Sequence, residues 1–232
     1  MPGPSLLQRL GVGRPSVLER CSQAADSGYW LALRFTPDAT PHQVTSFTNR
    51  WAETGLLPIT VMVLPRHLAS LDPVDDGIEW LAELTSLTPP VAAAPLVPAA
   101  AKGAESYCRE FRGPLVALDD SSPEGFADRC FANRAEQDKS FVRCAKALMA
   151  GVVAHRVERV QLWAGTPRVI SACRTAAHNA GLQAGGSYEF CIPEKQRAAA
   201  ERLLREGETV RMEFQIDQTV LDRTGPERTV AR

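Results

Sequence analysis

A repeated unit of apolar strand, capped turn and helix is the feature that most constrains the fold of this chain. The stretches 29–35, 114–120 and 160–165 are expected strands, and each runs into a hydroxyl residue followed by a proline: Thr40-Pro41, Ser122-Pro123 and Thr166-Pro167. The hydroxyl accepts hydrogen bonds from the exposed amides of a helix start, and proline suits the first helical position because it has no N–H and a fixed φ. The pattern therefore predicts three helices that begin in the same way.

Glycine marks the return from helix to strand. Five glycines each follow an expected helix and precede an expected strand: Gly28, Gly55, Gly113, Gly181 and Gly207. Glycine adopts the left-handed conformation that ends many helices without a steric cost. Together with the capped turns, these glycines predict a series of βα units.

The composition of the strands indicates how they pair. Several are almost continuously apolar, which is typical of a parallel sheet covered on both faces: 29–35, 58–64, 114–118 and 160–163. The stretch 210–216 instead alternates, with Arg211 and Glu213 on one face and apolar residues on the other, so we expect a half-exposed edge strand there. The Pro/Ala-rich stretch 91–97 is either a further strand or part of a linker.

These units predict an α/β fold, with a TIM-like barrel favoured over an open doubly wound sheet. At 232 residues and 44% hydrophobic content, the chain is long enough to bury one full core. We expect a single domain over 1–232, made of a βα-repeat core at 14–193 followed by a C-terminal helix and edge strand at 194–232.

Composition excludes several classes of partner. The formal net charge is -1, so no overall field draws the chain to nucleic acid or to an anionic membrane. The six cysteines form no C-x-x-C pair, which argues against a zinc site and a disulfide framework.

With no signal-like start and no apolar run near the roughly 18 residues that span a bilayer, we expect a soluble cytoplasmic protein. No cofactor and no metal is predicted.

Both candidate architectures place ligands at the carboxyl ends of the strands. The polar residues expected there are the candidates for ligand binding: Arg34, Arg66, Asp119, Asp120, Thr166 and Arg168. Asp119 and Asp120 either hold a metal or move a proton, or they only form a turn. Because adjacent side chains on a strand point in opposite directions, at most one of the two is expected to face the site.

The turn Ala164-Gly165-Thr166-Pro167-Arg168 has two readings. Free amides and the helix dipole at the start of the helix would attract a phosphate beside Arg168. The turn lacks the several glycines of a nucleotide-binding loop, however, so we expect Thr166 to act first as a helix cap.

A second basic feature is the window 129–175, with a stripe of Lys139, Arg143 and Lys146 on one helix. Nucleic-acid binding would need interleaved aromatic residues or a known motif, and neither is present. We therefore interpret the stripe as a solvated helix face.

Four stretches lie in a suggestive order: LALRFTP at 31–37, VALDDSS at 116–122, EQDKSFV at 136–142 and GSYEFCIP at 186–193. In this order they resemble motifs of the EAL-type barrel family of cyclic di-GMP phosphodiesterases. The sequence departs from that family where catalysis would occur. It has no E-A-L signature, the family's metal-binding asparagine falls on Arg34, and LWAGTPR replaces the catalytic A-E-G-V-E. Only Asp119 and Asp120 remain as matched acidic residues.

This resemblance implies a catalytically inactive EAL-like barrel that acts as a regulatory binding module for a protein partner or a cyclic dinucleotide. Two-metal hydrolysis needs several converging carboxylates, and one aspartate pair does not supply them. The alternative is an enzyme that acts on a small anionic or phosphorylated substrate at the strand ends. In that case Arg34, Arg66 and Arg168 would hold the anion, and Asp119 or Asp120 would move a proton.

Overall fold

The computed structural model describes residues 15–65, 91–119, 134–163 and 167–224. Within them, seven parallel strands close into a barrel in the order in which they occur along the chain. The strands are β1 (Trp30–Phe35), β2 (Thr60–Leu64), β3 (Ala92–Pro98), β4 (Gly113–Asp119), β5 (Val157–Trp163), β6 (Tyr188–Pro193) and β7 (Val210–Ile216). The fold is therefore α/β and TIM-like, and the open doubly wound sheet is excluded.

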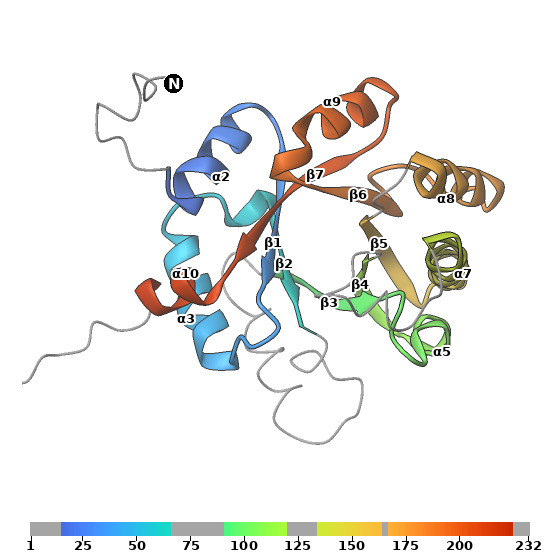
Figure 1. Ribbon diagram of the computed structural model, residues 1–232, viewed down its shortest axis with the longest axis horizontal. Helices are drawn as coiled ribbons and strands as arrows, with labels where there is room; N and C mark the ends of the chain where they lie inside the picture. The colour runs from blue at the N-terminus through green and yellow to red at the C-terminus, as the bar shows by residue number, and fades with distance from the viewer. Residues whose placement is uncertain (1–14, 66–90, 120–133, 164–166, 225–232) are drawn as a thin grey trace, which may run out of the picture.

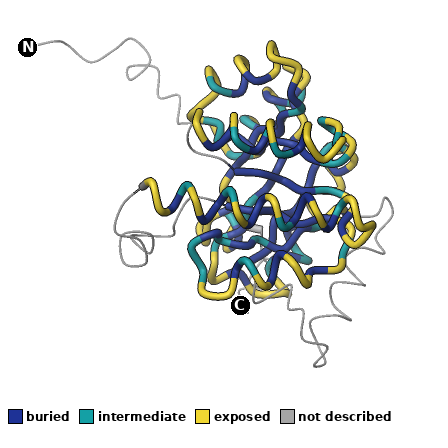
Figure 2. The backbone as a smooth tube through the Cα atoms, turned by 90° about the vertical axis from the view of Figure 1, so that its right-hand side faces the viewer, coloured by how far each residue is buried: buried dark blue, intermediate teal, exposed yellow. Residues whose placement is uncertain are grey.

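Helices surround the strands on the outside of the barrel (Figure 1). They are α2 (Val17–Asp26), α3 (Pro41–Ala52), α5 (Ala104–Glu110), α7 (Arg134–Val153), α8 (Pro167–Asn179), α9 (Arg197–Arg205) and α10 (Gln218–Thr224), with short 3₁₀ turns at Leu57–Ile59 and Glu194–Gln196. Figure 2 shows buried backbone in the interior and exposed residues on the outer faces of the helices. In the described part of the chain, no helix combines the length and the apolar character needed to span a bilayer.

The turns follow the predicted chemistry where the structure describes them. Thr40 caps α3 through a reciprocal capping box with Gln43, and Pro41 occupies the first turn. Pro167 begins α8, whereas its expected cap Thr166 and the Ser122-Pro123 turn lie outside the described residues. Four of the five predicted glycines have a positive φ; Gly113 instead begins β4.

Two expectations about individual strands are resolved by the pairing. The stretch 91–97 corresponds to β3, which pairs with both β2 and β4, so it is a strand and not a linker. The prediction of an edge strand at 210–216 is wrong, because β7 pairs with β6 and with β1. Two of its polar residues, Arg211 and Glu213, face the inside of the barrel and are buried, whereas Gln215 near the end of the strand is exposed.

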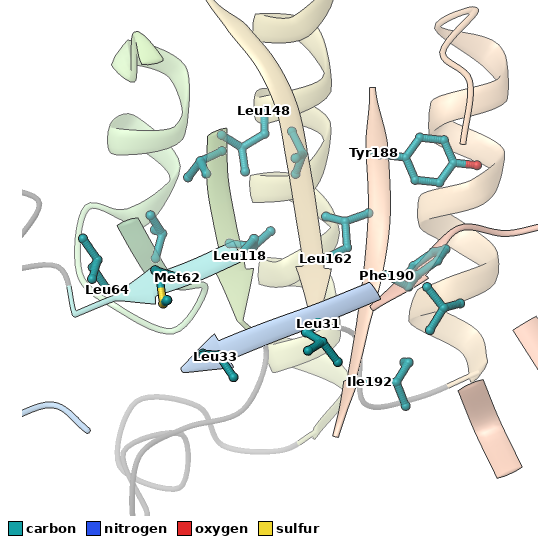
Figure 3. Close-up of a cluster of buried hydrophobic side chains, with 14 of the residues drawn as sticks. Leu31, Leu33, Met62, Leu64, Leu118, Leu148, Leu162, Tyr188, Phe190 and Ile192 are labelled. Carbon is teal, nitrogen blue, oxygen red and sulfur yellow. The ribbon is translucent and has the colours of Figure 1, made fainter. Parts of the chain in front are cut away.

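The larger hydrophobic core lies between the strands and the surrounding helices. Figure 3 shows part of it, with side chains from the outward faces of β1, β2, β4, β5 and β6. The smaller core fills the lumen with inward-facing residues of β1 to β6: Ala32, Val61, Val63, Ala94, Leu115, Ala117, Trp163 and Cys191. These residues are mostly small, which leaves room for the polar side chains described next.

Candidate functional site

Two clusters of charged residues lie inside the barrel, one toward each end of the strands. At the carboxyl end, Arg34 of β1 donates from Nη1 to Asp119 Oδ2 of β4 at 2.8 Å. The same nitrogen lies 3.9 Å from Glu213 Oε1 of β7. Three strands that are distant in sequence therefore bring one guanidinium and two carboxyl groups together. We call these three residues the carboxyl-end cluster.

Trp163, the last residue of β5, forms one wall of this cluster. The Arg34 guanidinium carbon lies 4.9 Å from the centre of the Trp163 rings, in a cation–π contact. Trp163 is paired in register with Asp119, so both side chains project from neighbouring strand ends. The indole Nε1 is buried and has no hydrogen-bond partner.

The carboxyl-end cluster is buried but not closed. The Asp119 side chain is 2% exposed and that of Glu213 is 4% exposed, whereas Arg34 keeps 18% of its side chain exposed. Arg34 is thus the member that solvent, or a ligand entering from the strand ends, can reach.

Burial changes the ionisation of Glu213. Loss of solvent raises the pKa of this carboxyl group to about 7, against the opposing effect of Arg34 and with a further increase from Asp119. Lys195 has a smaller lowering effect. Glu213 therefore changes its charge near neutral pH, as a general acid or base must.

The second cluster lies toward the amino ends of the strands. Arg211 of β7 donates from Nε to Glu189 of β6 and from Nη1 to the backbone carbonyls of Leu31 and Ile59, at 3.2 and 3.1 Å. Gln161 of β5 also donates to Glu189, at 2.6 Å. One oxygen of Gln161 and one of Glu189 have no hydrogen-bond partner. We call Arg211, Glu189 and Gln161 the amino-end cluster.

Cys191 lies between the two clusters. Burial, with Glu189 as the next cause, raises the pKa of its thiol well above the usual range, so the sulfur stays protonated at neutral pH. A neutral buried thiol is a poor nucleophile. Cys191 therefore fills part of the lumen with a protonated thiol.

The structure brings only some of the predicted site residues together. Arg34 and Asp119 meet, but Arg168 is exposed at the start of α8, where it lines a hollow of about 410 Å³ with Lys139 and Arg143 of α7. Arg168 is thus outside the lumen that holds Arg34. Arg66, Asp120 and Thr166 lie outside the described residues. In the described ranges, no group of three or more His, Cys, Asp or Glu residues is arranged to hold a metal ion.

Reasoning from the sequence missed Glu213, because the polar face of its strand was assigned to solvent. A usable signal was present: Arg211, Glu213 and Gln215 alternate on the last strand of a predicted barrel. In a closed barrel that face is the lumen.

Comparison with solved structures gives the fold class. The chain superposes on proline utilization A from Bdellovibrio bacteriovorus, inactivated by N-propargylglycine, with a TM-score of 0.62 and 12% identity. This match covers 89% of the present chain and 30% of the other. Proline utilization A from Corynebacterium freiburgense matches with a TM-score of 0.58 and 12% identity, over 91% and 29% of the two chains. No family model and no curated protein matches the sequence.

The chain thus has the fold of a TIM-like barrel and spans less than a third of the length of these two proteins.

The resemblance to EAL-type barrels is wrong, because the structural matches are to proline utilization A. The motifs misled because an apolar strand that ends in polar residues occurs in any parallel barrel: VALD is the end of β4 and YEFCIP is β6. Asp119 is ion-paired with Arg34. The interpretation of the chain as a catalytically inactive EAL-like module that binds a protein partner or a cyclic dinucleotide is therefore wrong as well.

Proposed function

We propose that this chain is an enzyme that acts on a small carboxylate-bearing substrate at the carboxyl ends of its barrel strands. The observation that carries the proposal is the carboxyl-end cluster, in which a partly exposed arginine and a carboxyl group with a pKa of about 7 share one buried site. Buried groups with shifted pKa values are concentrated at active sites, and barrels of this type place catalysis at this end.

Arg34 is the group that binds the substrate carboxylate. A guanidinium presents parallel N–H donors that match the two oxygens of a carboxylate. The contacts with Asp119 and Trp163 hold the Arg34 side chain in one orientation, so less conformational freedom is lost when the ligand binds.

The net charge of the carboxyl-end cluster favours a zwitterionic substrate over a dianionic one. One guanidinium and two carboxyl groups give a net charge of zero when Glu213 is protonated and of -1 when it is ionised. A phosphate dianion would be repelled by the two carboxyl groups. A zwitterion such as an amino acid places its carboxylate on Arg34 and its ammonium group beside Glu213, and both charges are then compensated.

Glu213 is the general base in this proposal. Its pKa of about 7 allows the ionised form to accept a proton from the bound substrate at neutral pH. The similarity in fold to proline utilization A, one example of which is inactivated by N-propargylglycine, supports amino acids as the first compounds to try.

The experiment is a binding and exchange assay with L-proline, glycine and N-methylglycine. Calorimetry should detect binding that Arg34→Met abolishes, and proton NMR in D₂O should detect exchange or conversion of the bound compound. Glu213→Gln should keep binding and lose the chemistry, and the wild-type rate should rise with pH through about 7. Binding that survives Arg34→Met, or no binding of any of these compounds, would contradict the proposal.

A further inference from the structure

The indole of Trp163 differs from the other fully described buried tryptophan, Trp51. The N–H of Trp51 donates to the Thr60 hydroxyl at 3.1 Å, whereas Trp163 is 4% exposed and its N–H has no partner. Leaving a buried donor unpaired is unfavourable, and native proteins pair most such groups. The unpaired donor therefore indicates that something absent from the protein alone accepts from it.

The position of Trp163 identifies what that acceptor is. Its rings lie against the Arg34 guanidinium, so a ligand held by Arg34 would lie close to the indole. Asp119 pairs with Trp163 in register, but its carboxylate does not accept from the indole N–H. A ligand held by Arg34 is therefore the acceptor that this arrangement favours.

We infer that the Trp163 indole N–H donates a hydrogen bond to the carboxylate of the substrate, so that Trp163 and Arg34 together form its recognition site. This inference rests on the proposed function, since it assigns a second donor to the same substrate group. Trp163 thus determines specificity: it selects ligands that carry an acceptor oxygen beside the one held by Arg34.

Calorimetric titration with L-proline, and with acetate as a carboxylate that lacks the amino group, tests the inference. Trp163→Phe keeps an aromatic face for Arg34 and removes only the donor. It should weaken binding of both compounds about tenfold or more, by a similar factor, because the lost hydrogen bond goes to a charged acceptor. Trp30→Phe is the matched control, since Trp30 stacks on Arg211 at the opposite end of the lumen. It should leave binding unchanged.

A second measurement does not depend on the folding of a variant. In wild-type protein labelled with ¹⁵N-tryptophan, the Nε1–H resonance of Trp163 should move downfield when acetate or L-proline is added, and that of Trp51 should not. If Trp163→Phe binds as tightly as wild type and the resonance does not move, the N–H meets only water and the inference is wrong. The proposed function survives that result if Arg34→Met still abolishes binding, and both fail if the wild type binds neither compound.

Discussion

Each end of the barrel lumen contains an arginine stacked on a tryptophan, and the two pairs are arranged in opposite ways. At the amino end, Arg211 is buried and Trp30 lies outside, 48% exposed, with 4.8 Å between the guanidinium carbon and the ring centre. At the carboxyl end, the tryptophan is the buried partner and the arginine reaches solvent. The arginine at the amino end is covered by its tryptophan, whereas Arg34 rests on a buried tryptophan and keeps part of its own side chain accessible to solvent.

The hydrogen bonds of the two arginines support this distinction. Arg211 contacts Glu189 and two backbone carbonyls, and all of these acceptors belong to the framework of the barrel. Arg34 lies between two carboxyl groups, one of which titrates near pH 7. The carboxyl end is thus able to change its charge near neutral pH through Glu213.

The largest expected effect is on the amino-end cluster. Arg211→Met should lower the free energy of unfolding by about 3 to 5 kcal/mol, because it leaves the Glu189 carboxyl group buried without its main partner. Denaturant titration measures the change. Arg34→Met, the matched substitution, should cost less, since Glu213 can take up a proton to reduce the excess negative charge. If Arg211→Met and Arg34→Met lower the free energy of unfolding equally, the proposed difference between the two ends of the barrel is wrong.

The second effect is a pH dependence that originates at the carboxyl end. The pKa of Glu213 is about 7 in the folded protein and 4.5 for an unperturbed glutamate, so the unfolded chain releases this proton first as the pH rises. Folding stability should therefore fall by up to about 3 kcal/mol as the pH passes from below 4.5 to above 7. In Glu213→Gln this contribution disappears, and the variant should be more stable than wild type under alkaline conditions.

The measurement is a set of urea titrations of the wild type and of Glu213→Gln, at mildly acidic and at mildly alkaline pH. The free energy of unfolding of the wild type should fall between the two pH values, and that of the variant should fall less. The residues that set this titration, Arg34, Asp119 and Lys195, are unchanged in the variant. Parallel stability curves would show that Glu213 does not hold its proton in the folded state.

The smallest expected effect concerns Arg159, the second arginine near Glu189 at the amino end. Arg159 lies 3.9 Å from Glu189 and is 33% exposed at its side chain, so solvent weakens the pair. Arg159→Gln should change the free energy of unfolding by less than about 0.5 kcal/mol. Thermal melts of Arg159→Gln and Arg211→Met, measured side by side, check this. A large loss of stability in Arg159→Gln would mean that both arginines are needed to stabilise the buried Glu189 carboxylate.

The order of strands and helices could be predicted from the sequence, because caps such as Thr40 and turn glycines such as Gly28 act locally. Arg34 and Asp119 could be proposed as site residues for the same reason: both stand near the ends of apolar strands. Their ion pair could not be foreseen, since it joins residues 85 positions apart through barrel closure. Glu213 was missed because a lumen face and a solvent face have the same alternating pattern, and only the pairing of the last strand distinguishes them.

The pairing of β1 with β7 has a consequence for how the chain folds. Arg211 and Leu31, which meet at this junction, are separated by 180 residues. During synthesis on the ribosome, β1 therefore has an open edge until nearly all of the described chain has emerged. Contacts between such distant segments form slowly, and an unpaired strand edge promotes association with other chains in the meantime. We expect the closing of this junction to be the step at which the nascent barrel is most exposed to aggregation.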